Sequence, residues 1–290
     1  MIKVSFDSIF KTVLKAVGVL MLLLLAGIFV TLVIDSLPAM KAAGFAFFTG
    51  TTWDPVFKEY GSLVFLVGTL LTSFLALAIS LPFSLAIAIF LGEYFRSGLV
   101  SSFLKSAIEL MAGIPSVIFG MWGLFVLVPL VRQVEMQFGV APYGIGILTA
   151  SLILAVMIIP YSASISSDVV NLVPADLKEA ALSLGATRYE MIKKVVLPSA
   201  RSGIFAGVLL SLGRAIGETM AVTMVIGNAN ILPTSIFSPA NTMASIIANE
   251  FAEATDAVYI SCLIEVGLLL MMVTLVISMI GRYIMHRMKI

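Results

Sequence analysis

Long apolar stretches constrain this sequence more than any other feature. Hydrophobic residues make up 60% of the 290 residues and charged residues only 11%, and the mean hydropathy is +1.13. A soluble domain cannot bury that much apolar surface. A membrane-spanning helix needs roughly 20 predominantly apolar residues. Stretches of about that length lie at residues 13–34, 62–92, 108–131, 145–167, 203–227 and 259–281.

These stretches are expected to be helices, because in lipid only a helix satisfies its own backbone hydrogen bonds within one segment. The strands of a membrane barrel would instead show alternating segments of about ten residues. We therefore predict an all-α fold, a polytopic membrane helical bundle with about six transmembrane helices. The first apolar run is longer than the roughly 7 to 15 residues of a signal peptide core, so it is expected to be an uncleaved span.

Basic residues indicate how the chain crosses the membrane, because Lys and Arg are enriched in cytoplasmic loops. If the N-terminus lies inside, only Lys41, Lys58 and Arg132 fall outside, and Arg214 falls within a span. All other Lys and Arg residues, including Lys3 and Lys289, then lie on the inner side. We predict that both termini are cytoplasmic.

The sequence offers little for covalent chemistry. It contains one cysteine, Cys262, and one histidine, His286, and neither belongs to a nucleophile set or a metal-ligand spacing. A phosphate-cradling Walker A loop is also missing from the sequence. We expect no catalytic residue, no bound metal or cofactor and no nucleic-acid partner, so any ATP must be hydrolysed by a partner subunit.

The polar loop between the fourth and fifth spans, at about residues 171–198, is expected to form a helix, a turn and a second helix. Pro174 can start the first helix, which Asp176 favours at the positive end of its dipole, and Gly185 suits the left-handed residue that ends it.

The second helix of this loop is expected to start at a capping box made by Thr187 and Glu190. Pro198 is expected to end it, because proline lacks the backbone donor that an α-helix needs.

One face of the first short helix carries Leu177, Ala180, Ala181 and Leu184 at helical spacing. The spacing leaves two readings open. This apolar face either packs against the chain's own spans or inserts into a groove on another subunit.

The same loop resembles the EAA loop of bacterial ABC importer permeases. The matching residues are Glu179-Ala-Ala, Gly185 and Leu197-Pro198, and Val195 stands where that pattern usually has Ile. The resemblance implies type I ABC importer permease architecture. It also implies that the short helix rests on an ATP-binding subunit and passes its motion to the spans. The implied coupling residues are Leu177, Glu179, Ala180, Ala181, Leu184 and Gly185.

The fifth span contains a charged pair, Arg214 and Glu218, whose spacing of four places both on one face of a continuous helix. An arginine at mid-membrane costs roughly 2.5 to 3.5 kcal/mol on insertion scales, and such residues commonly mark transport pathways. Ser211 and Thr219 add hydroxyl groups nearby. Two hypotheses remain open: an ion pair that only fixes packing, or a transient oxyanion site in which Glu218 orients Arg214.

Gly213 to Asn228, together with Ala112-Gly-Ile-Pro-Ser116, resembles the phosphate-specific importer permeases of the PstC type. The resemblance implies a phosphate pathway in a bacterial plasma membrane, although an arginine also suits sulfate or molybdate. It further implies a paralogous permease as heterodimer partner, two ATP-binding subunits and an extracytoplasmic phosphate-binding protein. We divide the chain into residues 1–61, a transmembrane helix with an outer loop, and residues 62–285, the permease core.

Two other intramembrane residues stand out. Pro115 is a candidate hinge, or a kink that only shapes packing, in the third span. Glu265 is a carboxylate in the sixth span that an arginine on another helix could pair.

The two long outer loops carry apolar side chains. Met243, Ile246 and Ile247 recur at helical spacing and predict a short amphipathic helix, which either docks a partner or packs on the bundle. The aromatic residues of the first outer loop are expected to form an interfacial belt. They are Phe45, Phe47, Phe48, Trp53, Phe57 and Tyr60.

Overall fold

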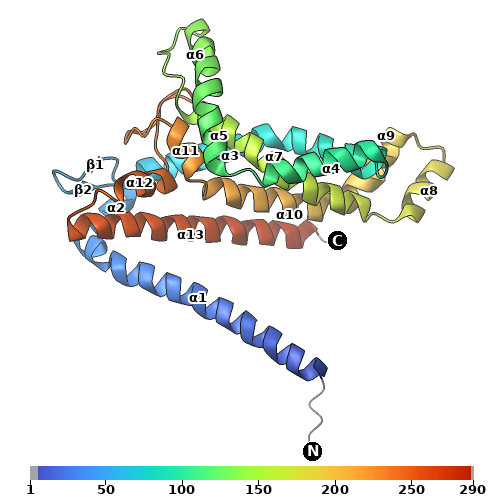
Figure 1. Ribbon diagram of the computed structural model, residues 1–290, viewed down its shortest axis with the longest axis horizontal. Helices are drawn as coiled ribbons and strands as arrows, with labels where there is room; N and C mark the ends of the chain where they lie inside the picture. The colour runs from blue at the N-terminus through green and yellow to red at the C-terminus, as the bar shows by residue number, and fades with distance from the viewer. Residues whose placement is uncertain (1–5, 289–290) are drawn as a thin grey trace, which may run out of the picture.

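Six helical segments in the computed structural model are long and apolar enough to cross a membrane, within the described residues 6–288 (Figure 1). They are Ile9–Ala43, Leu63–Tyr94, Ser116–Gln137, Ile147–Asn171, Arg188–Ile216 and Ala257–Met288. The predicted all-α bundle with about six spans is therefore confirmed, although several span ends differ from expectation. Lys3 and Lys289, which entered the prediction of orientation, lie outside the described residues.

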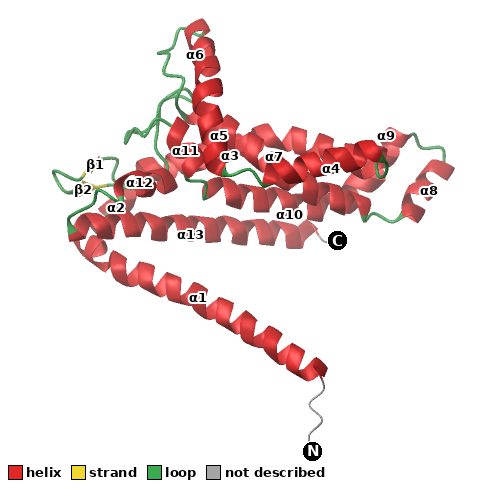
Figure 2. Cartoon of the chain, viewed as in Figure 1, coloured by secondary structure: helices red, strands yellow, loops and turns green. Residues whose placement is uncertain are grey.

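Helices dominate the chain, and a single short hairpin interrupts them in the described residues (Figure 2). The first half contains α1 (Phe6–Ala43), α2 (Ala46–Thr49), β1 (Trp53–Asp54), β2 (Glu59–Tyr60), α3 (Leu63–Ile89), the π-helical turn η1 (Phe90–Tyr94), α4 (Leu99–Ala112), α5 (Ser116–Trp122), the π-helical turn η2 (Gly123–Leu127) and α6 (Val128–Gln137). The second half contains α7 (Ile147–Asn171), α8 (Ala175–Ser183), α9 (Arg188–Met191), the π-helical turn η3 (Ile192–Val196), α10 (Leu197–Ile216), α11 (Met220–Val225), α12 (Met243–Glu250) and α13 (Ala257–Met288).

The first and third spans differ from their predicted ends. Helix α1 continues through Pro38 to Ala43, as membrane helices can do when neighbouring groups satisfy the freed carbonyl. The third span begins at Ser116 instead of residue 108, because the chain breaks at Gly113-Ile-Pro115 and the preceding residues belong to the separate helix α4. Pro115 has an extended backbone and is the N-cap residue of α5. Proline suits this position because it has no backbone N–H, and none is needed before the first turn of a helix. It therefore opens a helix and does not kink one.

The fifth span also differs, in two places. Pro198 does not end a helix: α9, η3 and α10 are consecutive, and Pro198 lies in the first turn of α10, directly after the π-helical turn. Proline has no backbone N–H to donate, and the helix tolerates this because the π-helical turn before it already shifts the pattern of backbone hydrogen bonds. Near its other end the span is interrupted, since α10 stops at Ile216 and α11 starts at Met220.

Helix α7 forms the centre of the bundle and packs against α3, α4 and α10. Its buried residues include Ile153, Leu154 and Ile158, each at most 1% exposed. Helix α10 comes close to α7 at Gly203, where an added Cβ would lie 2.5 Å from a methyl group of Val169. Small residues thus permit the close helix packing that membrane proteins favour.

Helix α1 lies apart from this core. Its contacts are mainly with α13, from which it diverges towards its own N-terminal end (Figure 1), and its apolar window has no buried residue. A long apolar helix with so much exposed surface is consistent with contact to lipid or to another subunit.

One end of the molecule, which we call the hairpin end, carries β1, β2, α2 and α12 (Figure 1). Trp53, Tyr60 and Phe47 are buried there in one cluster, and the Trp53 indole donates to Glu250 Oε2 at 2.8 Å. These three aromatics therefore pack in a core, contrary to the predicted interfacial belt, whereas Phe45 and Phe57 are exposed.

The predicted amphipathic helix exists as α12, and its apolar face is covered by the bundle. Met243 and Ile246 are fully buried in the same cluster as Trp53. Of the two readings, packing on the bundle is correct for this face. At the same end Lys58 donates to Asp256 at 2.8 Å, and this hydrogen bond holds the pKa of Asp256 below its ordinary value.

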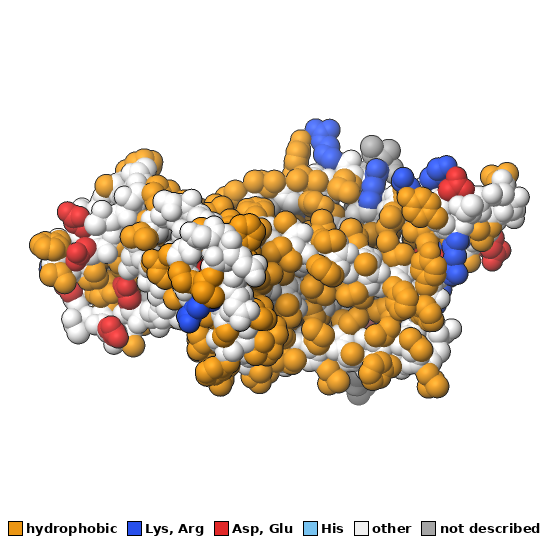
Figure 3. Space-filling model, turned by 90° about the horizontal axis from the view of Figure 1, so that it is seen from above, with side chains coloured by type: hydrophobic (Ala, Val, Ile, Leu, Met, Phe, Trp, Pro, Cys, Tyr) orange, Lys and Arg blue, Asp and Glu red, His pale blue; other side chains and the backbone are white. Residues whose placement is uncertain are grey.

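The opposite end, which we call the α8 end, carries α8, α9 and η1 (Figure 1). Helix α1 begins and α13 ends on this side of the molecule (Figure 1). In the view of Figure 3, most Lys and Arg side chains gather towards the α8 end, and the hairpin end shows mainly Asp and Glu. This separation matches the charge distribution expected of a membrane protein with the α8 end inside.

Candidate functional site

Arg214 lies near the end of α10, close to the interruption of the fifth span. Its guanidinium carbon lies 4.2 Å from the centre of the Tyr161 ring on α7. Its Nε atom is buried and has no hydrogen-bond partner within residues 6–288. A guanidinium over an aromatic ring is held there by cation–π attraction, and its N–H donors match the geometry of an oxyanion.

Tyr161 connects this arginine to the break before the third span. Its hydroxyl donates to the carbonyl of Ala112, the last residue of α4, at 3.1 Å. Ala112, just before the break at Gly113-Ile-Pro115, and Arg214 of α10 therefore both contact Tyr161. Sequence reasoning did not find Tyr161, because a tyrosine within an apolar span carries no signal of its contacts.

The predicted pairing of Arg214 with Glu218 is wrong. The two residues do not share a helix face, because α10 ends between them at Ile216. Glu218 Oε1 instead accepts from the backbone N–H of Ala221 at 3.3 Å, within the first turn of α11. Among residues 6–288 no ion pair joins Glu218 to Arg214.

The hydroxyl residues predicted for this site have local partners. Ser211 is fully buried and donates to the carbonyl of Gly207 at 2.9 Å, so it faces away from open space. Thr219 is the residue before α11, and its hydroxyl donates to the carbonyl of Gly217 at 3.3 Å.

The surface around Gly213 and Gly217, at the end of α10 near Arg214, is open. An added Cβ at Gly213 would meet no atom of the described chain within 4 Å, and at Gly217 it would meet only the Gly213 carbonyl at 3.8 Å. These glycines therefore do not mediate a helix contact within this chain. They leave room for a second subunit or a ligand beside Arg214.

Glu265 has no polar partner in the described chain. Both carboxylate oxygens of Glu265 are buried and have no hydrogen-bond partner within residues 6–288, so no arginine of the described chain pairs with this carboxylate. The same part of the chain contains no group of three or more His, Cys, Asp or Glu side chains placed to hold a metal ion.

The loop at the α8 end has the predicted helix, turn and helix. Helix α8 starts at Ala175, one residue after Pro174, and Gly185 has the left-handed backbone expected after it, with φ of +85°. Thr187 and Glu190 form the predicted capping box, in which each side chain accepts from the other's backbone N–H.

The apolar face of α8 points away from the bundle. Leu177 is 49% exposed, Leu184 is 90% exposed, and Ala180 and Glu179 are also exposed. Only Ala181 packs against the buried cluster beneath the helix. The reading in which this face packs on the chain's own spans is therefore wrong for the two leucines.

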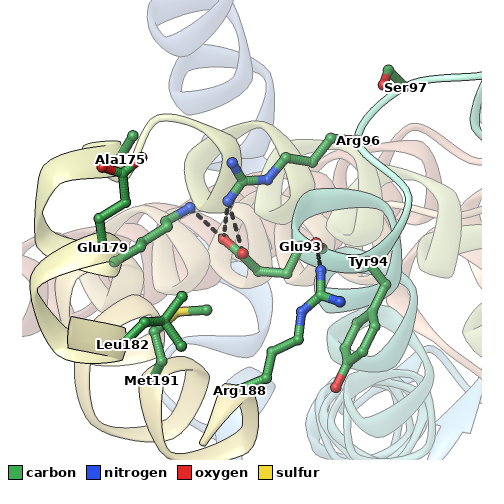
Figure 4. A pocket seen from close by; sticks show the side chains of 10 residues that line it. Glu93, Tyr94, Arg96, Ser97, Ala175, Glu179, Leu182, Arg188 and Met191 are labelled. Carbon is green, nitrogen blue, oxygen red and sulfur yellow. Dashed lines mark hydrogen bonds and ion pairs between the residues drawn. The ribbon is translucent and has the colours of Figure 1, made fainter. Parts of the chain in front are cut away.

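A buried charge cluster, which the sequence did not reveal, holds α8 in place. Glu93 in η1 is 4% exposed and accepts from Lys178 of α8, which is equally buried. Arg96 donates to both oxygens of the same carboxylate at 2.8 and 2.7 Å. Arg188 of α9 donates to the Glu93 carbonyl at 2.8 Å and stacks on Tyr94 (Figure 4).

The comparison with known proteins decides the family. Residues 84–290 match the family described as the binding-protein-dependent transport system inner membrane component. The chain belongs to this family. Its members are transport components of the membrane, so the prediction of a multi-pass transport subunit rather than an enzyme is confirmed. Membership of this binding-protein-dependent family also implies that the chain acts with an ATPase and a substrate-binding protein.

Curated members of this permease family resemble the chain over nearly its whole length. The phosphate transport system permease protein PstC of Mesorhizobium japonicum is 44% identical over 296 residues, which cover 97% of this chain and 90% of the relative. The protein of the same name from Haemophilus influenzae is 43% identical, covering 98% of this chain and 94% of the relative.

A solved structure agrees with the fold of this binding-protein-dependent permease. The MetNI methionine ABC transporter, in an inward facing conformation, matches with a TM-score of 0.58 at 21% identity. The match covers 79% of this chain and 95% of the solved chain. The predicted type I ABC importer permease architecture is thereby confirmed.

Proposed function

We propose that this chain is one permease subunit of an ATP-driven phosphate importer in a bacterial plasma membrane. The observation that carries the proposal is the near full-length similarity to proteins named phosphate transport system permease PstC. Sulfate and molybdate, which the arginine alone leaves open, have no comparable support among these names.

Phosphate would contact Arg214 during its passage. The guanidinium lies over the Tyr161 ring, near the open surface at Gly213 and Gly217. Its other N–H donors would bind the oxyanion, and a single arginine gives weak binding that permits release. Glu218 caps α11 and so stabilises the interruption of the span near Arg214.

The exposed surfaces support the proposed partners. The open face of α10 would meet a paralogous permease, and the exposed leucines of α8 would enter a cleft on one of two ATP-binding subunits. The α8 end and both termini would then be cytoplasmic, and a phosphate-binding protein would deliver its cargo at the hairpin end. ATP would be bound by the partner, and this chain would bind no cofactor.

Arg214→Gln tests the pathway in the assembled transporter reconstituted in vesicles. The variant loses the charge but keeps a polar side chain, so we expect phosphate uptake to fall at least about tenfold while the complex still assembles. Arg201→Gln is the matched control, because Arg201 lies on the same helix, is exposed and bonds only the Met288 carbonyl among the described residues. Uptake by Arg214→Gln at the rate of the control would contradict the pathway role.

Competition assays test the substrate. We expect unlabelled phosphate to suppress labelled phosphate uptake, whereas sulfate and molybdate at the same concentration should leave it unchanged. Equal suppression by either of these oxyanions would contradict the assignment of phosphate.

A further inference from the structure

The buried cluster around Glu93 connects the short helix α8 to the long helix α3. Lys178 is the buried residue of α8. It points inward, while Leu177 and Leu184 of the same loop point outward. Helix α8 thus exposes apolar side chains that a partner could cover, and its one buried cation contacts the bundle. A short helix with only Ala181 packed in an apolar cluster needs such an anchor to move together with the spans.

Glu93 belongs to the membrane-spanning segment and not to the loop. It lies in η1, which continues α3 without a break, and Gly92 beside it packs closely on α7, where an added Cβ would lie 2.5 Å from Val170. Lys178 also donates to the carbonyl of Val170 at 3.4 Å. The ammonium of α8 therefore contacts the ends of two core helices at once.

Two further cations, from different segments, also contact Glu93. Arg96, just after η1, donates from its Nη2 atom to both carboxylate oxygens, and Arg188 of α9 donates to the backbone carbonyl of Glu93 (Figure 4). A carboxylate that is held by two cations in a buried site resists separation, because either partner left alone would be an uncompensated buried charge. Displacement of α8 must therefore displace the end of α3.

Helix α3 carries this displacement across the molecule. Near its far end the hydroxyl of Thr69 accepts from the backbone N–H of Met243, the first residue of α12, at 2.9 Å. At Gly68 the helix touches the Asn241 carbonyl so closely that a Cβ would lie 2.0 Å from it. The same helix is thus fastened to α8 at one end and to α12 at the other.

We infer that Glu93, through its buried ion pair with Lys178, is the positioning residue that makes α3 the element on which α8 acts. The inference rests on the proposed function, because it requires an ATPase that moves α8. It adds a specific route: from the ATPase to α8, through Lys178 and Glu93 to α3, and along α3 to α12 at the hairpin end.

Lys178→Met tests this route in the reconstituted complex. The outward leucines are unchanged, so we expect the ATPase subunits to co-purify and to hydrolyse ATP, while the phosphate transported per ATP hydrolysed falls at least about tenfold. Lys178→Arg keeps the charge and should restore much of that ratio. Lys11→Met removes an equal charge from the exposed pair with Asp7, and it should leave the ratio at the wild-type value.

The ratio of transport to hydrolysis separates this role from a merely structural one. A structural role would lower the yield of complex or its thermal stability without changing the ratio in the complex that remains. An unchanged ratio in Lys178→Met would overturn the inference. If this variant does not fold, Arg96→Gln loosens the same carboxylate from its half-exposed side and should lower the ratio more mildly, and an unchanged ratio there would overturn it equally.

The wild-type protein separates failure of the inference from failure of the proposed function. If the wild-type chain does not associate with an ATPase, or does not accumulate phosphate with ATP, the proposed function fails. If the wild type does both and Lys178→Met keeps its ratio, only the route through Glu93 fails.

Discussion

Arg214 lies in a segment where a charged side chain is costly, and its surroundings explain how it is tolerated. Insertion of an arginine at mid-membrane costs roughly 2.5 to 3.5 kcal/mol, and stacking on a ring recovers about 2 kcal/mol where water is excluded. Tyr161 supplies that ring at 4.2 Å. This contact offsets part of the cost of Arg214, while Glu218, which lies beyond the end of α10, accepts from the backbone N–H of Ala221.

At the same scale, Gly185 determines where α8 stops. Its φ of +85° disfavours other residues, yet an added Cβ would meet no described atom within 4 Å. The penalty of a substitution is therefore conformational, about 1 kcal/mol or more for most side chains, and smaller for asparagine. We expect Gly185→Val to weaken co-purification of the ATPase and Gly185→Asn to preserve most of it. Equal behaviour of the two variants would show that backbone conformation is not the cause.

Sequence reasoning could not predict where the helices are interrupted. Hydropathy predicts that six spans exist, because lipid requires long apolar helices. It does not reveal the stop after Ile216, since Gly217-Glu-Thr219 also fits a continuous helix. At Pro198 the sequence predicted a helix end that the structure does not have, because the π-helical turn η3 lets the helix continue past the proline.

Two glycines on α10 differ in what surrounds them, and this difference can be measured. Gly203 lies against the branched side chain of Val169, so Gly203→Ala should cost about 1 to 3 kcal/mol through overpacking. Gly213 has open space within this chain, so Gly213→Ala should be neutral or slightly stabilising, because alanine is the better helix former. Thermal unfolding of the purified chain tests both. A larger loss for Gly213→Ala would contradict the packing described here.

For the whole molecule, the two ends differ in charge and in exposed surface, and α3 joins them. The resemblance of the loop predicted the α8 end, because the Glu-Ala-Ala and Gly185 pattern is local in sequence. The contact between Glu93 and Lys178 was not predictable in the same way, since the two residues are 85 positions apart and only the fold brings them together. The sequence pattern predicts the short helix α8, and the structure shows that its Lys178 contacts Glu93 at the end of α3.

In the proposed mechanism, ATP hydrolysis by a partner acts on α8 and moves phosphate through a passage that this chain helps to form. The most direct measurement is the accumulation of labelled phosphate in vesicles that contain this chain with a paralogous permease and the ATPase subunits. We predict accumulation only when ATP and the phosphate-binding protein are both supplied, on their respective sides of the membrane. Phosphate entry that is equally fast without ATP would contradict the account.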